Sequence, residues 1–201
     1  MTVDTDYKIN FMPKTKKYTA FIIPASNTPA KNGTIHAIND LMPVIEPAPQ
    51  SVLFEVTDFL EIRNGDWFGK YYMKWNDGQN DLAKIKFEGD FLGYYYKTHD
   101  CPDAIGRDAL FMLGFWWIEV TFPKVIKGKY KIIYGSNWGG TASFNILLDG
   151  KQTKYLYDGP KGGNQTIADA DFATSCEHKI KLVPTIYGAL YWDYVQFVPV
   201  E

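Results

Sequence analysis

The chain has 201 residues, of which 46% are hydrophobic and 16% are aromatic, so it can bury a large core. Its formal net charge is −2 and its Lys and Arg residues are scattered, which argues against nucleic acid as a partner. No apolar run reaches the roughly 18 residues that a membrane-spanning helix requires, so no transmembrane segment is predicted.

The first part of the chain contains little that can form a core. Two short runs of β type, at residues 18–23 and 34–38, precede a proline-rich stretch at residues 43–51. Repeated proline disfavours both helices and central strands, so this stretch is predicted to be an extended linker. We therefore expect a small β appendage with its linker over residues 1–50, followed by one domain over residues 51–201.

Alternation of apolar and polar side chains marks strands in the second part of the chain. The alternating segments are residues 52–57, 116–122, 130–134, 144–148 and 178–182. A last run, residues 190–198, is apolar on both faces and is predicted to be one central strand.

Turn signals separate these strands. Asp149-Gly150 is a strong hairpin signal, and no stretch keeps a helical period over three turns. Many short strands with frequent turns indicate an all-β fold. We predict an antiparallel β-sandwich of the jelly-roll type with the small N-terminal β appendage.

Residues 32–43 read Asn-Gly-Thr-Ile-His-Ala-Ile-Asn-Asp-Leu-Met-Pro. This segment resembles the closing motif of fasciclin-type domains, which has Asn-Gly, a His three residues later, an Ile-Asp-like pair and a final Leu and Pro. The resemblance places His36 at the family's characteristic histidine, which is structural there. Most of a fasciclin domain should precede this motif, so residues 1–50 are interpreted as a truncated or degenerate C-terminal remnant. Adhesion by an intact fasciclin domain is not implied.

A second resemblance covers roughly residues 52–201. Its motifs follow in the order 115–120, 128–132, 146–151, 177–182 and 192–199. This order is similar to galactose-binding-like jelly rolls and several carbohydrate-binding module families, with their Gly-x-Tyr strand, Leu-Asp-Gly hairpin, Gly-x-His-x-Ile strand and final Leu-Asp-Tyr-Ile-x-Phe strand. Here Cys176-Glu177 replaces the usual glycine before His178.

A fasciclin-like remnant joined to such a sandwich resembles bacterial cell-surface lipoproteins associated with glycan uptake. That resemblance implies an extracytoplasmic location at the cell surface. The opening Met-Thr-Val-Asp is not a signal peptide, so we expect any export signal to lie outside the given sequence.

The predicted ligand-binding residues lie in polar, glycine-flanked loops. Trp138 follows Ser136 and Asn137, and an indole there can stack on a sugar while the neighbouring polar groups bind its hydroxyls. Trp67 lies in a similar turn and is a further candidate. The alternative is that these rings fold back and cap the end of the sandwich.

Glu55 and Asp193 are candidate metal ligands. In several carbohydrate-binding jelly rolls, an acid on the first strand and one on the last hold a structural calcium, and these two positions are similar. Carboxylates suit this hard cation. The alternative is an Asp193 that is hydrogen-bonded without metal. We expect no other cofactor, and Cys101 and Cys176 can either pair or stay free.

These observations predict a non-enzymatic binding module whose likeliest ligand is a glycan. The alternative is a structural or adhesion module that docks a neighbouring domain or surface protein. A glycoside hydrolase is the third hypothesis and would need two carboxylates about 5–9.5 Å apart in one cleft. The chain contains no Gly-x-Ser-x-Gly elbow, phosphate-binding loop or His-Glu-x-x-His helix, so no enzyme is predicted.

Overall fold

The protein is described from a computed structural model. It divides into two compact units, Met1–Pro47 and Ala48–Glu201, and each is described by itself. Among the residues described, no helix is long and apolar enough to cross a membrane. The structure describes residues 8–12, 17–40, 47–59, 72–74, 83–96, 103–136, 140–157 and 163–200.

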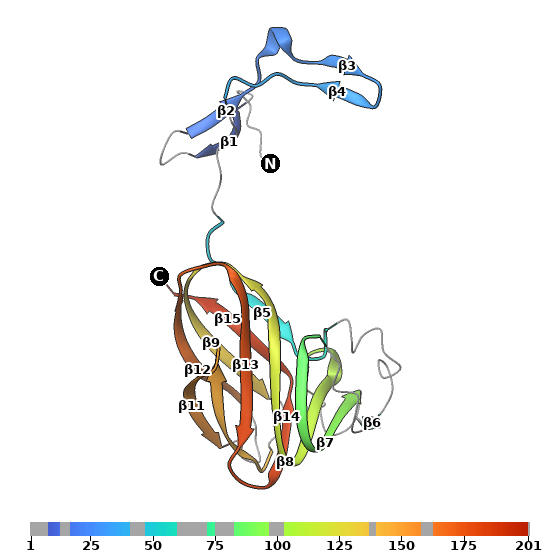
Figure 1. The fold of residues 1–201 in the computed structure, drawn as a ribbon, viewed down its shortest axis with the longest axis vertical. Helices are drawn as coiled ribbons and strands as arrows, with labels where there is room; N and C mark the ends of the chain where they lie inside the picture. The colour runs from blue at the N-terminus through green and yellow to red at the C-terminus, as the bar shows by residue number, and fades with distance from the viewer. Residues whose placement is uncertain are drawn as a thin grey trace. The chain divides into compact units, whose positions relative to one another are not determined.

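The first unit consists of two small antiparallel hairpins (Figure 1). Its elements are β1 (Lys8–Met12), β2 (Lys17–Ala20), the short 3-10 helix η1 (Ile23–Ala25), β3 (Thr28–Ala30) and β4 (Gly33–Ile35). Backbone pairing between Phe21 and Ile38 joins the two hairpins. Large apolar side chains stay exposed, including Ile23 at 55% and Ile35 at 59%. This unit therefore buries little of its apolar surface.

The second unit is an antiparallel β-sandwich, as the alternation predicts (Figure 1). In its described part, the larger sheet has seven strands, in the order β11 (Lys151–Tyr157), β10 (Ser143–Leu148), β13 (Cys176–Pro184), β8 (Asp108–Val125), β7 (Ile85–Tyr96) and β6 (Tyr72–Lys74), with β14 (Gly188–Trp192) paired to β8. The smaller sheet has the order β12 (Gly163–Phe172), β9 (Gly128–Ser136), β15 (Tyr194–Pro199) and β5 (Val52–Glu55). A short 3-10 helix, η2 (Ile105–Arg107), precedes β8.

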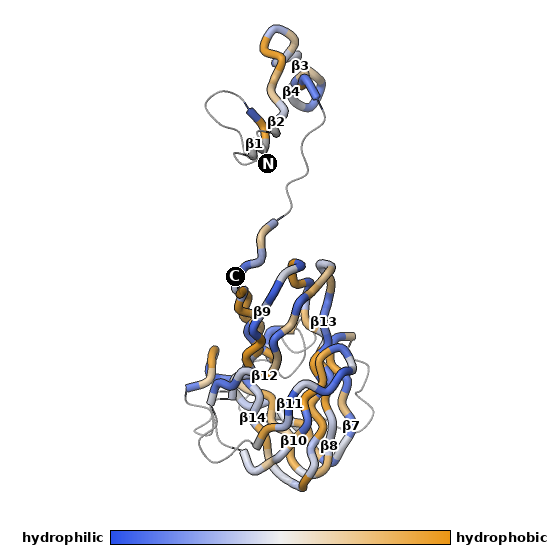
Figure 2. The backbone as a smooth tube through the Cα atoms, turned by 90° about the vertical axis from the view of Figure 1, so that its left-hand side faces the viewer, coloured by the Kyte–Doolittle hydropathy of each residue, from blue (hydrophilic) through white to orange (hydrophobic). Residues whose placement is uncertain are grey.

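The core lies between the two sheets. Along β8, buried side chains such as Ile118 and Val120 alternate with partly exposed ones such as Glu119 and Thr121. The same alternation in β13 is visible as interleaved hydrophobic and hydrophilic residues (Figure 2). Inward-facing rings from both sheets meet in this core, for example Tyr134 and Phe144 at 5.9 Å between centroids. The period of two therefore determines which face of each strand is buried.

The prediction of one strand over residues 190–198 is wrong. The run divides at Asp193 into β14, which pairs with β8 in the larger sheet, and β15, which pairs with β5 and β9 in the smaller one. Asp193 is buried, and its N–H donates to the Gly135 carbonyl at 3.1 Å. Its own carbonyl accepts from Val56 N–H at 2.8 Å. β15 lies between two strands of its sheet, whereas β14 pairs only with β8 among the described strands, and in β14 buried residues alternate with partly exposed ones.

Candidate functional site

A bulge between β7 and β8 shapes the outer face of the larger sheet. The register shifts between Gly89 and Phe91, and both Gly89 and Gly114 have positive φ angles, 148° and 100°. A Cβ on Gly89 would lie 2.5 Å from the Phe115 carbonyl oxygen, and one on Gly114 would collide with the Asp90 side chain. The bulge therefore requires glycine at these positions, and it re-aims the residues beside them.

Three aromatic side chains lie on the outer face next to this bulge. Phe115 on β8 is 58% exposed, and Tyr187, in the turn before β14, is 61% exposed. Their rings meet edge to face with centroids 5.8 Å apart. Trp117, two residues further along β8, has the same strand phase as Phe115 and is partly exposed. We call Phe115, Trp117 and Tyr187 the aromatic patch.

Charged side chains fix the patch in place. The Trp117 Nε1–H donates to Glu88 Oε2 at 2.9 Å, and the Phe115 backbone N–H donates to Asp90 Oδ2 at 2.9 Å. The Lys181 ammonium lies 3.8 Å from the centroid of the Trp117 ring. These contacts hold the rings in one orientation and leave charged groups at their edge.

A hollow of about 290 Å³ opens at the patch. Its lining residues are Glu88, Gly89, Phe115, Trp116, Trp117 and Pro184. Trp116 itself is buried and packs against Phe144 in the core, so only its neighbours on β8 present rings outward. An apolar concave surface bordered by carboxylates and an ammonium group is suited to a ligand with both an apolar face and hydroxyl groups.

A sequence signal for the patch exists, although it was not used in the prediction. Trp117 alternates in step with Glu119 and Thr121, which belong to the polar phase of the strand. A tryptophan in the polar phase of an amphipathic strand is expected on the solvent side. The contribution of Tyr187 has no such signal, because its position depends on the turn between β13 and β14.

Most of the predicted ligand-binding residues lie outside the described part of the chain. This holds for Trp138, Asn137 and Trp67, whose role stays a prediction. Ser136 is described: it ends β9 and is fully buried. Thr141, three residues after Trp138, donates its N–H to the Ala189 carbonyl at 2.8 Å. Ala189 is itself two residues after Tyr187 of the aromatic patch.

Glu55 ends β5 in the smaller sheet, and Asp193 joins β14 of the larger sheet to β15 of the smaller one. The Asp193 carboxylate accepts a hydrogen bond from the Ile105 backbone N–H at 3.1 Å, as expected for the alternative in which Asp193 is hydrogen-bonded. A Cβ on Gly106 would lie 3.1 Å from both Glu55 Oε2 and Asp108 Oδ1, so η2 packs closely on these carboxylates. Within the described residues, no three His, Cys, Asp or Glu side chains are close enough to hold a metal ion together.

Asp108 is a third acid at this end that the sequence analysis did not identify. It is buried, and its two carboxylate oxygens accept from the hydroxyls of Thr57 at 3.0 Å and Tyr94 at 2.9 Å. Burial, together with the charge of Asp193, raises the pKa of Tyr194, while a hydrogen bond with the Asn164 side chain opposes this rise. The end of the sandwich therefore carries the carboxyl groups of Glu55, Asp108 and Asp193, whose oxygen atoms are of the kind that binds hard cations.

The sheets described above define the second unit as an antiparallel β-sandwich of the jelly-roll type. No protein-family model matches the chain, so the fasciclin resemblance stays a prediction. No curated protein sequence matches it either.

Three solved structures similar to the chain are carbohydrate-binding modules. The CBM36-1 domain of a multidomain xylanase from the hindgut metagenome of Trinervitermes trinervoides has 10% identity and a TM-score of 0.44, with 76% of this chain and 99% of that chain covered. CBM35 from Paenibacillus barcinonensis has 11% identity and a TM-score of 0.42, with 74% and 99% covered. A CBM36 module in complex with calcium and xylotriose has 17% identity and a TM-score of 0.36, with 63% and 98% covered.

Proposed function

We propose that the sandwich unit is a non-catalytic carbohydrate-binding module and that the aromatic patch holds the sugar. The observation that carries this proposal is the exposure of Phe115 and of the Tyr187 ring that packs on it, beside Trp117 and a hollow that Phe115, Trp117 and Glu88 line. A pyranose ring has an apolar face of C–H groups that packs on an aromatic ring, while its rim of hydroxyls needs hydrogen-bond partners.

The charged residues supply those partners. Glu88 and Asp90 carry carboxylates that accept from sugar hydroxyls, and Lys181 carries an ammonium group that donates to them. Because Glu88 also holds the Trp117 indole at 2.9 Å, the stacking surface is ordered before the ligand arrives. Preorganisation of this kind lowers the entropic cost of binding.

The test is calorimetric titration of the full chain with xylotriose, mannotriose and galactobiose at millimolar concentrations. Binding of at least one sugar is expected, and Trp117→Ala and Phe115→Ala should each abolish it. Tyr155→Ala is the matched control, because Tyr155 is 54% exposed on β11 and lies outside the patch. No heat with any sugar, or unchanged binding in Trp117→Ala, would contradict the proposal.

The predicted loop site is tested in the same titrations. If Trp138→Ala loses binding while Trp117→Ala does not, the sugar-binding site is assigned to Trp138 and its neighbours and not to the aromatic patch. The alternative of an adhesion module shares the exposed rings. It is favoured if no sugar binds while Phe115→Ala lowers association with a neighbouring surface protein.

We propose that the module does not cleave its ligand. Each carboxylate beside the patch holds an aromatic residue, Glu88 through the Trp117 indole and Asp90 through the Phe115 backbone, so we assign both a positioning and sugar-binding role. A reducing-sugar assay on the bound oligosaccharide should therefore show no release over hours. Hydrolysis that Glu88→Gln abolishes would instead support the glycoside hydrolase hypothesis.

We also propose a structural calcium ion at the end of the sandwich, held by Glu55 and Asp193. The oxygen-rich donor set there suits a hard cation, which would neutralise the negative charge of the buried acids. In a thermal melt of the full chain, added calcium should raise the melting temperature, and Glu55→Gln should remove that response. An equal response to calcium in Glu55→Gln would overturn this assignment.

For the protein as a whole we propose an extracytoplasmic location at a cell surface, with residues 1–50 as the remnant of a fasciclin-type domain. The Asn-Gly-x-x-His segment supports the interpretation as a remnant, as do the exposed Ile23 and Ile35 in the first unit. Protease treatment of intact source cells should degrade the protein. Full protection until the cells are lysed would contradict the location.

A further inference from the structure

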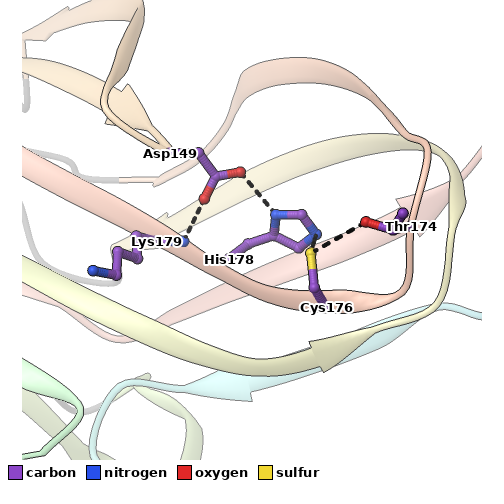
Figure 3. Close-up of polar contacts among 5 residues, drawn as sticks. All are labelled: Asp149, Thr174, Cys176, His178 and Lys179. Atoms are coloured by element: carbon purple, nitrogen blue, oxygen red, sulfur yellow. Dashed lines mark hydrogen bonds and ion pairs between the residues drawn. The ribbon is translucent and has the colours of Figure 1, made fainter.

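A Cys–His–Asp array lies where β13 begins, among residues that the aromatic patch does not use (Figure 3). Cys176 and His178 are two residues apart on β13, and Asp149 lies in the hairpin turn between β10 and β11. The Cys176 Sγ is 3.7 Å from His178 Nε2, and His178 Nδ1 is 2.8 Å from Asp149 Oδ2. Cys176 is an exposed free thiol.

The imidazole is held firmly by its surroundings. The His178 side chain is only 5% exposed, and its ring stacks on Phe172 with centroids 3.6 Å apart and planes 20° from parallel. The other oxygen of Asp149 accepts from the Lys179 backbone N–H at 2.8 Å, which fixes the carboxylate. With the proton of the neutral ring on Nδ1, facing Asp149, the lone pair of Nε2 points to the thiol.

Local structure brings the three residues together. Asp149 has a φ of 49°, a left-handed conformation that Asp tolerates in a tight turn, and its N–H donates to the Lys179 carbonyl at 2.8 Å. The pairing of β13 with β8 shifts by one residue between Cys176 and His178. Because residues two apart on a strand project from the same face, the exposed Cys176 and the buried His178 reach each other directly.

We propose that Cys176 is an activated thiol that exchanges with small disulfides, with His178 as its base and Asp149 as a positioning residue. The order of nucleophile, base and orienting carboxylate is that of an activated nucleophile. A second contact reaches the sulfur, because the Thr174 hydroxyl donates to Sγ at 3.9 Å. Asp149 and Phe172 also line a hollow of about 540 Å³ with residues of β11 and β12, and the thiol itself is open to a small molecule because Cys176 is exposed.

The reaction is a thiol–disulfide exchange. The Cys176 thiol gives its proton to His178 Nε2, and the resulting thiolate attacks one sulfur of the incoming disulfide. A new S–S bond forms to Cys176 while the original S–S bond breaks. The leaving thiolate takes the proton from the imidazolium and departs as a thiol. The Cys176 sulfur is oxidised from thiol to disulfide while the leaving sulfur is reduced from disulfide to thiol, so the exchange balances without another oxidant.

The test uses the full chain with oxidised glutathione as the probe, followed by peptide-resolved mass spectrometry. Cys176 should form a mixed disulfide at least about tenfold faster in the folded protein than in the same chain unfolded in urea. This comparison needs no variant. Equal rates in the folded and unfolded chain would overturn the proposal.

Variants then assign the roles. His178→Phe keeps an aromatic ring against Phe172 but removes the base, and it should slow Cys176 to the rate of the unfolded chain. Asp149→Asn keeps the hairpin conformation and should slow the reaction several-fold. It should also shift the ring nitrogen resonances of His178, which a purely structural role would leave unchanged.

The matched control is Asp171→Asn, which removes an exposed acid that lines the same hollow and lies on β12, where it pairs with Lys129 of β9. Its rate should equal that of the unsubstituted protein. A folded His178→Phe variant with an unchanged rate would overturn the assignment of the base. An equal slowing by Asp171→Asn and Asp149→Asn would overturn the positioning role of Asp149.

Discussion

The ammonium group of Lys181 lies over the indole of Trp117, 3.8 Å from the ring centroid. The two residues come from neighbouring strands, β13 and β8. The ring nitrogen of the same indole donates a hydrogen bond to Glu88. One exposed tryptophan is thus fixed by a cation on its face and a carboxylate at its ring nitrogen. This arrangement keeps the ring in place as a flat contact surface without burying it.

Removing the charge on Lys181 should therefore loosen Trp117. Lys181→Met keeps most of the aliphatic stem and should lower the free energy of unfolding by about 0.5 kcal/mol, as expected for an exposed cation–π contact. Urea titration measures this change. Lys179→Met is the control, because Lys179 pairs with Glu119 at 3.6 Å and not with the indole. An equal loss in the control would show that the effect is not specific to Trp117.

Gly114→Ala should disrupt the bulge under the aromatic patch. The substitution forces an unfavourable φ of 100° on alanine and drives its Cβ into the Asp90 side chain. We expect a loss of roughly 2–3 kcal/mol in the free energy of unfolding, together with weaker sugar binding. Urea titration and calorimetry measure the two effects.

Gly150→Ala is the control for that prediction. Gly150 also has a positive φ, 80°, but nothing lies within 4 Å of an added Cβ. It should cost only about 1 kcal/mol and leave sugar binding intact. The explanation by collision with Asp90 fails if both glycine variants lose the same amount of stability.

Asp108→Ala should be among the most destabilising substitutions at the end of the sandwich. It removes the acceptor of two buried hydrogen bonds, from the hydroxyls of Thr57 and Tyr94. Buried donors left without acceptors cost about 1–3 kcal/mol each, so we expect a loss of at least about 2 kcal/mol by chemical denaturation. Asp103→Ala, at an exposed position before η2, should change stability little. Similar losses in both variants would argue against a structural role for Asp108.

Stability should fall at high pH because of Tyr194 and Tyr130. Burial is the main cause that raises the pKa of each phenol in the folded protein. A raised pKa means that the folded state binds more protons than the unfolded state, so its contribution is present below the unfolded pKa of about 10 and is lost as the pH rises through the folded value. Unfolding midpoints measured from pH 8 to 11 should decline in the upper part of that range.

Tyr194→Phe tests the origin of this decline. It removes one of the two phenols that must stay protonated, so the slope of stability against pH above about pH 10 should become smaller. Tyr187→Phe is the comparison, because its ring is 61% exposed in the aromatic patch. A slope that changes only in Tyr187→Phe would contradict the prediction.

The sequence predicted the sandwich better than it predicted the site. Alternation identifies strands because each face of a sheet meets one environment, and the predicted segments at 116–122, 130–134 and 144–148 all lie in strands. The same pattern could not show that residues 190–198 change sheets, because the run is apolar in both strand phases before and after Asp193. Only Asp193, a buried acid within an apolar run, marks that change.

The aromatic patch was harder to predict because it depends on several separate segments. Trp117 had a usable signal in its polar strand phase, whereas Phe115 and Tyr187 meet only through the bulge and the turn after β13. The Cys–His–Asp array was hard to predict for the same reason, because its residues come from separate segments. The Leu-Asp-Gly hairpin and the strand with His178 were both recognised, but their side-by-side placement follows from the pairing of β10 with β13.

The crossing of the chain at Asp193 has a mechanical consequence. Since Asp193 alone joins β14 of the larger sheet to β15 of the smaller one, tension on the final strand reaches both layers through this residue, which is itself bonded to Gly135 and Val56 beside the smaller sheet. Peeling this segment would separate the layers together and not one after the other. The amide protons of β14 and β15 should therefore exchange with solvent in a single cooperative opening.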